Sequence, residues 1–157
     1  GKPWKYVRIN QDTLGSRGKC ESLTRTTLLE GKCPIIDRCN FNNTQRKHFW
    51  TIRDEVRRQQ QQQKKKQPQQ QQNQRKYPPI PVDCIVFGFP PHVCLRRCKR
   101  REDHETVLPA DADKVVRAMQ KEFSPPKAKD KREPFRKIHK ISTLSEFSDL
   151  LTQYLFQ

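Results

Sequence analysis

Val7-Arg8-Ile9-Asn10-Gln11-Asp12-Thr13-Leu14-Gly15-Ser16 is the stretch that indicates the fold most clearly. Two alternating apolar residues, Val7 and Ile9, are followed by an acidic residue, a glycine and then a helical pattern. Buried parallel strands end in this way, and open α/β sheets bind their ligands at the carboxyl ends of such strands. The stretch Pro34-Ile35-Ile36-Asp37-Arg38-Cys39-Asn40 repeats the arrangement. We therefore expect two strand-end aspartates, separated by one helix, at one edge of a sheet.

Strand and helix patterns alternate along the rest of the chain. We expect strands near residues 7–10, 34–37, 82–89 and 138–141, and helices near 17–30, 42–56, 90–101, 111–123 and 144–155. Gly31 suits the end of the first helix, Asn42 can cap the second, and Ser142-Thr143 can cap the last. With right-handed crossovers, this order predicts an α/β fold, a parallel sheet with helices on both faces.

A glutamine- and lysine-rich stretch interrupts the pattern over residues 57–77. Its central part, residues 59–74, has no apolar side chain whose burial could offset the entropy of ordering. We interpret it as a disordered insertion or as an overrun of the preceding helix, with a coiled coil as a weaker alternative. Apart from this insertion, the length suits one domain over residues 1–157.

The charge indicates an anionic partner. The 157-residue chain has a formal net charge of +16, which favours nucleic acid, a nucleotide or a membrane surface. The sequence contains no signal peptide and no apolar run near 18 residues, so neither export nor a membrane-spanning helix is expected.

The six cysteines are scattered and form no C-x-x-C pair, which is typical of reduced intracellular thiols. A zinc site made by Cys94 and Cys98 with His92 or His104 is conceivable. Its irregular spacing argues against it, and we predict no metal ligands.

Three groups of polar residues are candidates for chemistry, and each has a plain structural alternative. Asp12 could accept a proton from a hydroxyl that attacks a phosphoryl group, or it could cap a helix. Asp37 could hold Mg²⁺ through water, while Arg38 and Asn40 could hold a phosphate or a base; alternatively, the cluster caps a helix.

Arg97 and Arg101 are four residues apart, so they share one helix face, and His104 follows them. They could bind the phosphates of a nucleotide, or they could belong to a solvated basic face. The sequence contains no G-x-x-x-x-G-K-[S/T] loop.

These motifs resemble the P-loop kinase domain of polynucleotide kinase 3′-phosphatase, and still more the kinase-like domain fused to aprataxin-type histidine-triad proteins. The similar residues are Arg8 to Gly15, Gly31 to Asn40, and the spacing Arg97-x-x-x-Arg101-x-x-His104, which is similar to the lid of that family. Phe123-Ser-Pro-Pro126 and Pro134-Phe135 resemble the segment after the lid. The resemblance covers nearly the whole chain outside the glutamine-rich insertion.

The resemblance implies a role for each motif. Asp12 would be the general base on the 5′-hydroxyl of a polynucleotide, and Arg97 and Arg101 would be catalytic lid residues on the ATP phosphates. Asp37, Arg38 and Asn40 would line the acceptor and phosphate site. ATP and Mg²⁺ are the expected cofactors, nucleic-acid 5′ ends the partner, and the nucleus the location, with further domains fused to this one.

The first strand and phosphate-binding loop of that family should precede Gly1, so we expect an N-terminally incomplete domain that binds ATP poorly alone. Strand-break repair is the function implied by the resemblance. Two other interpretations stay open: a noncatalytic basic nucleic-acid-binding module on the same fold, and a small-molecule or nucleotide kinase.

Overall fold

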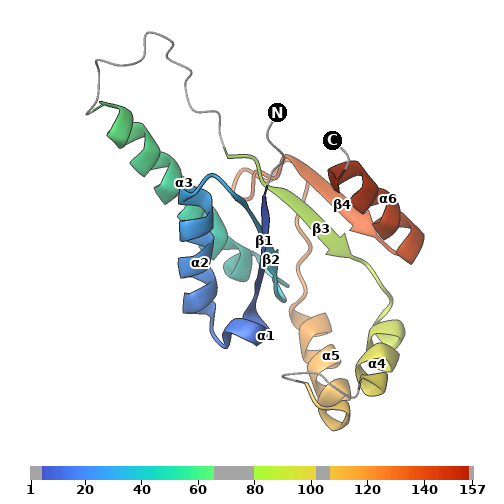
Figure 1. Cartoon of the computed structure of the whole chain (residues 1–157). Helices are drawn as coiled ribbons and strands as arrows, with labels where there is room; N and C mark the ends of the chain where they lie inside the picture. The colour runs from blue at the N-terminus through green and yellow to red at the C-terminus, as the bar shows by residue number, and fades with distance from the viewer. Residues whose placement is uncertain (1–4, 66–79, 102–106, 156–157) are drawn as a thin grey trace. The chain divides into compact units, whose positions relative to one another are not determined.

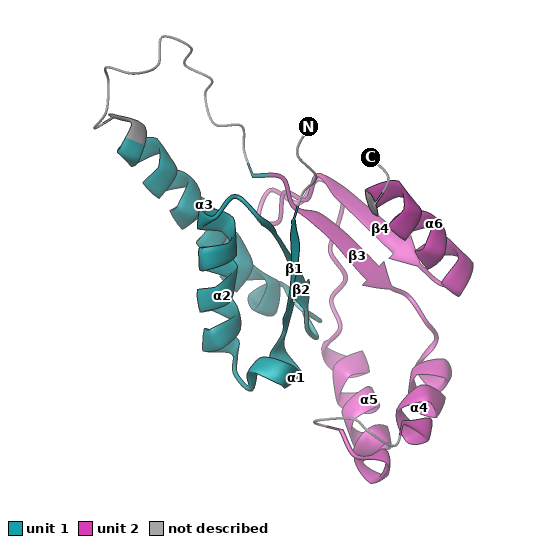
Figure 2. Cartoon of the chain, in the orientation of Figure 1, with its two compact units in different colours: residues 1–80 teal, residues 81–157 magenta. Residues whose placement is uncertain are grey.

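The chain has an α/β fold divided into two compact units, Gly1–Ile80 and Pro81–Gln157 (Figures 1 and 2). The structure is a computed structural model and describes residues 5–65, 80–101 and 107–155. Within this part of the chain, each unit contains one two-stranded parallel sheet, β1–β2 or β3–β4.

The first unit is built on a β-α-β arrangement. Its elements are β1 (Tyr6–Asn10), α1 (Gln11–Leu14), α2 (Arg17–Leu29), β2 (Cys33–Asp37) and α3 (Asn43–Lys65). The strands β1 and β2 are parallel, and Tyr6 lies opposite Cys33 and Asn10 opposite Asp37. Helix α2 joins the two strands and packs against both, while α3 packs beside α2 (Figure 1).

The core of this unit follows the apolar pattern of its elements. Its buried apolar side chains come from β1, α2 and α3: Ile9, Cys20, Trp50, Ile52 and Val56. The expected helix ends are confirmed: Gly31 has a φ of 71°, which glycine adopts without steric cost. The Asn42 side chain accepts a hydrogen bond from the backbone N–H of Gln45 at 3.0 Å, as a cap does.

The second unit contains another parallel strand pair and three α-helices among its described residues. Its elements are β3 (Asp83–Phe87), α4 (Pro91–Arg100), the 3₁₀ turn η1 (Pro109–Asp111), α5 (Ala112–Glu122), β4 (Lys137–Ile141) and α6 (Leu144–Leu155). Asp83 lies opposite Lys137, and Phe87 lies opposite Ile141. Helix α4 packs against α5, and α6 packs against β4. Helix α6 begins with a capping box, in which Glu146 N–H donates to Thr143 Oγ1 at 3.2 Å and Thr143 N–H donates to the Glu146 carboxylate at 3.0 Å.

A polar network attaches α6 to the amino ends of β3 and β4. Tyr154 donates its hydroxyl proton to Asp83 at 2.6 Å, and Arg136 Nε donates to the same carboxylate at 2.8 Å. His139 Nε2 lies 3.1 Å from the Tyr154 oxygen, and because the phenol proton is used toward Asp83, His139 is the donor there. Burial and the neighbouring Asp83 carboxylate raise the pKa of Tyr154 to about 12. The network lies away from the ligand-binding end of the strands, so we assign it to stability.

The order of strands and helices confirms the expected α/β pattern, and three details differ. The sequence pattern did not indicate α1 or η1. Helix α3 continues to Lys65, so residues 57–65 extend the preceding helix, as one of the two interpretations of the glutamine-rich stretch expected. Residues 66–79 lie outside the described part. A continuous sheet was expected, but the described strands form two separate pairs. No helix in the described ranges is long and apolar enough to cross a membrane.

Candidate functional site

The carboxyl ends of β1 and β2 bring two polar side chains together. The parallel register places Asn10 opposite Asp37, and Asn10 Nδ2 donates a hydrogen bond of 3.0 Å to Asp37 Oδ2. The other end of the Asn10 amide caps α1 by accepting the backbone N–H of Thr13 at 2.9 Å. One asparagine therefore connects the start of α1 with the strand-end carboxylate.

Asp37 is held as an ionised acceptor. Arg8, two residues before Asn10 on the same face of β1, donates from Nε to Asp37 Oδ2 at 2.7 Å. Partial burial acts to raise the pKa of Asp37, but the hydrogen bonds from Asn10 and Arg8 and the charge of Arg8 outweigh it, so the pKa lies below its usual range. Asp37 is thus already bound to two side chains of β1, an arrangement that the sequence pattern did not indicate.

Asp12 lies directly beyond this pair. It occupies the first turn of the four-residue helix α1 and is exposed. Gly15 ends this helix with a φ of 76°, so the short turn keeps Asp12 next to the strand end. A hollow of about 180 Å³ is lined by residues of β1, α1 and α2: Arg8, Asn10, Thr13, Leu14 and Leu23. Asp12 itself does not line this hollow, but its neighbours Asn10 and Thr13 do.

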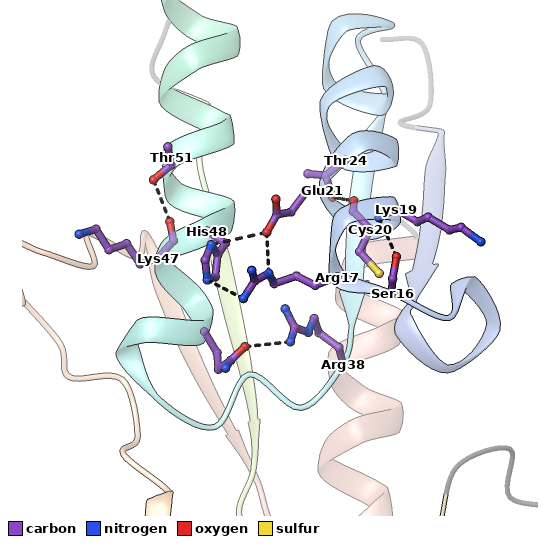
Figure 3. Close-up of polar contacts among 11 residues, drawn as sticks. Ser16, Arg17, Lys19, Cys20, Glu21, Thr24, Arg38, Lys47, His48 and Thr51 are labelled. Atoms are coloured by element: carbon purple, nitrogen blue, oxygen red, sulfur yellow. Dashed lines mark hydrogen bonds and ion pairs between the residues drawn. The ribbon is translucent and has the colours of Figure 1, made fainter.

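The side chain of Arg38 lies between α2 and α3 (Figure 3). Its Nη2 donates to Gln45 Oε1 at 2.9 Å, and its guanidinium lies 5.7 Å from the ring centroid of Phe49. The other two nitrogens, Nε and Nη1, are buried without a hydrogen-bond partner. Burial, with the nearby charge of Arg17, lowers the pKa of Arg38. In this position Arg38 contacts α3 through Gln45 and Phe49, and its contact with a phosphate stays a prediction.

Asn40, in the loop after β2, is held by a hydrogen bond from α3. The Asn40 backbone carbonyl accepts a 3.2 Å hydrogen bond from Arg46, a buried residue with 7% exposure. The side-chain oxygen of Asn40 is buried and has no hydrogen-bond partner. A buried arginine that fixes the loop after β2 could not be recognised from the sequence, because Arg46 lies within a run of mixed polar residues.

A second polar group lies across α2 and α3. Arg17 Nε is 3.1 Å from Glu21 Oε1, and Arg17 Nη1 is 3.3 Å from His48 Nε2 (Figure 3). His48 Nδ1 lies 3.5 Å from the same Glu21 oxygen. These contacts join the N-terminal halves of the two helices close to the buried Cys20, and burial raises the pKa of the Cys20 thiol.

The arginines expected in the lid are exposed on the second unit. Arg97 lies on α4, and Arg101 is the residue that ends it. The Arg97 guanidinium lies 4.3 Å from the ring centroid of Phe89, within range of a cation–π interaction. Lys99 of the same helix pairs with Asp113 of α5 at 2.6 Å. His104 lies outside the described residues.

The structure therefore places the expected residues in two groups. Asp12, Asp37, Arg38 and Asn40 lie at or after the strand ends of the first unit, and Arg97 and Arg101 lie on the second. A common site for both groups stays a prediction. Among the described residues, no three histidine, cysteine or acidic side chains form a group that could hold a metal ion.

Comparison with known proteins gives one distant similarity to report. No family model matches the chain. The chain is similar to "Transcription factor bHLH140" of Arabidopsis thaliana, with 26% identity over 110 residues. The match covers 68% of this chain but 10% of that protein, so this chain spans about a tenth of its relative's length.

Proposed function

We propose that this chain is part of a P-loop kinase-like domain that phosphorylates the 5′-hydroxyl ends of nucleic acids, in the nucleus and as part of a longer strand-break repair protein. The observation that carries the proposal is the register of β1 and β2, which pairs Asn10 with Asp37 at the carboxyl ends, next to the exposed Asp12. Ligands of open parallel sheets bind at this end.

Asp12 has the position and chemistry of a general base. An exposed carboxylate beyond a strand end can accept the proton of a hydroxyl that becomes a nucleophile. Asp37 is half-buried and accepts hydrogen bonds from Arg8 and Asn10, so we assign it to holding the strand end and assign proton transfer to the more exposed Asp12. In the proposed division of roles, Asp12 takes the proton, and Arg8, Asn10 and Asp37 fix the strand-end geometry around it.

The residues of this chain do not make a complete site for ATP and Mg²⁺. The sequence lacks the G-x-x-x-x-G-K-[S/T] loop, and the described residues offer no cluster of acidic metal ligands. We therefore assign this chain to the acceptor side of the reaction and derive no step through the nucleotide. Arg97 and Arg101 stay candidates for binding its phosphates.

The test is a phosphorylation assay on the full-length protein, with ATP and an oligonucleotide that has a 5′-hydroxyl end. Asp12→Asn should lower turnover about 10²–10⁴-fold, the usual contribution of general-base catalysis, because an amide of the same shape cannot accept the proton. Oligonucleotide binding should be largely retained. Asp149→Asn, at an exposed position on α6, is the matched control and should behave as wild type. Near-normal turnover of Asp12→Asn would show that Asp12 only stabilises α1.

A noncatalytic nucleic-acid-binding module is the second candidate. It is favoured by the net charge of +16 and by the exposed basic side chains of α4. The distant relative is named as a transcription factor, which agrees with nucleic-acid binding in general terms. A full-length protein that binds oligonucleotides but phosphorylates none would favour this candidate over the kinase.

A further inference from the structure

An aromatic side chain is unusually exposed at the carboxyl end of β3. Phe87, the last residue of β3, is 54% exposed, and Ile85, two residues earlier on the same face, is 40% exposed. Its ring is nearly parallel to that of Phe89, with an angle of 8° and 6.4 Å between centroids. Phe147 of α6 contacts Phe87 edge-on at 5.5 Å between centroids. An apolar ring at a strand end therefore presents a large part of its surface to solvent.

A positive charge lies against the same aromatic group. The Arg97 guanidinium is 4.3 Å from the ring centroid of Phe89. We call Phe87, Phe89, Arg97 and Phe147 the aromatic–arginine surface. Further exposed cations on α4 and at its end are Arg96, Lys99, Arg100 and Arg101. One exposed ring, Phe87, thus lies in the same unit as the half-buried rings of Phe89 and Phe147 and the exposed cations of α4.

The combination matches one class of ligand. Proteins that hold single-stranded nucleic acid join a positively charged groove for the backbone to aromatic rings on which bases stack, and arginine adds cation–π contacts. An apolar peptide is a poorer match, because it has no negative charge to pair with the cations. A duplex is also a poorer match, because its base faces are stacked on one another and cannot reach an aromatic ring. We propose that the second unit binds unpaired nucleotides of a nucleic-acid strand at the aromatic–arginine surface. The inference rests on the proposed function for the identity of the ligand as nucleic acid.

The experiment measures binding of the full chain to a fluorescent single-stranded oligodeoxynucleotide and to its duplex at one low salt concentration. The single strand contains 2-aminopurine, whose fluorescence falls when the base stacks. Phe87→Leu keeps an apolar side chain against Phe147 but removes the ring, and Phe87→Trp keeps a ring. Phe123→Leu is the matched control, since Phe123 is 49% exposed and ends α5 in the same unit.

We expect tighter binding to the single strand than to the duplex, with quenching of 2-aminopurine. Phe87→Leu should lower the affinity for the single strand by at least about fivefold and leave the duplex unchanged, whereas Phe87→Trp and Phe123→Leu should retain single-strand binding. Circular dichroism verifies that each variant is folded. Equal single-strand affinity for wild type and Phe87→Leu would show that the aromatic–arginine surface does not bind the strand. The proposed function would not be affected by that result. If wild type binds neither nucleic acid, the surface proposal is wrong, and the phosphorylation assay then decides separately on the kinase.

Discussion

At the scale of single residues, the strand-end aspartates differ in what surrounds them. Asp37 is bound by Arg8 and Asn10, and these contacts lower its pKa. Asp12 is exposed and lies in the first turn of α1, two residues after the Asn10 cap. Both residues come at the end of an apolar stretch, so the sequence pattern alone predicts the same position for them, at the carboxyl end of a strand. The side chains of β1 make the difference, because one face of β1 presents Arg8 and Asn10 to β2.

Asp83 allows a pH prediction at the same scale. The hydrogen bonds from Arg136, and further from Tyr154, lower the pKa of Asp83 below the usual value of 3.8. A lowered pKa in the folded state means that the stabilisation is present above the unfolded value and is lost as the pH falls through the folded one. Chemical denaturation of wild type and Asp83→Asn from neutral pH downward should therefore show a difference in unfolding free energy that shrinks below about pH 4.

The difference between the two proteins is the informative quantity, because Asp37 and other carboxylates also titrate in this range. Tyr154→Phe serves as a second variant: it removes one donor to Asp83 and leaves Arg136 in place, so its effect should be smaller than that of Asp83→Asn. A difference that stays constant down to pH 3 would show that the Asp83 network does not contribute to acid sensitivity.

At the scale of elements, the sequence predicted the parts of the fold that depend on local patterns. The strands at residues 7–10 and 34–37 and the caps at Asn42 and Gly31 follow from apolar periodicity and from residues with special backbone or capping chemistry. The short helix α1 was missed because it has no apolar periodicity and depends on the Asn10 cap. The direction of the Arg38 side chain was also beyond prediction, since it depends on Gln45 and Phe49 of α3, which only the tertiary packing brings close.

Helix α3 illustrates how stability is distributed within an element. Among its side chains that the structure describes, the last buried one is Val56, and residues 61–63 are exposed although helical. Changing Gln61, Gln62 and Gln63 to glycine should reduce helicity in circular dichroism but hardly change the melting temperature, because these three side chains are exposed and lie outside the core. Ile52→Ala, at 3% exposure on the same helix, should instead cost about 2–5 kcal/mol. Equal destabilisation by the two changes would mean that the glutamine-rich end packs against the fold.

At the scale of the whole molecule, the charge of +16 raises the question of whether nucleic-acid binding depends on the total charge or on one surface. Arg96 and Arg100 are exposed and lie on one face of α4, next to the aromatic–arginine surface in the sequence. Lys19 and Lys47 are exposed as well, but they lie on α2 and α3. Neutralising either pair lowers the net charge by two, so the pairs are matched in charge and differ in position.

The salt dependence of single-strand binding separates the two possibilities. For single strands, the slope of log K against log salt is about −0.7 for each phosphate that is neutralised, so losing two phosphate contacts should make the slope less steep by about 1.4. We expect this change for the double variant Arg96→Gln and Arg100→Gln, because both residues lie on the helix that carries Arg97. Lys19→Gln with Lys47→Gln should leave the slope near that of wild type. Fluorescence anisotropy titrations over a series of salt concentrations provide the measurement. Equal changes for both pairs would mean that binding follows the total charge, and an unchanged slope for the α4 pair would exclude these arginines from the phosphate contacts.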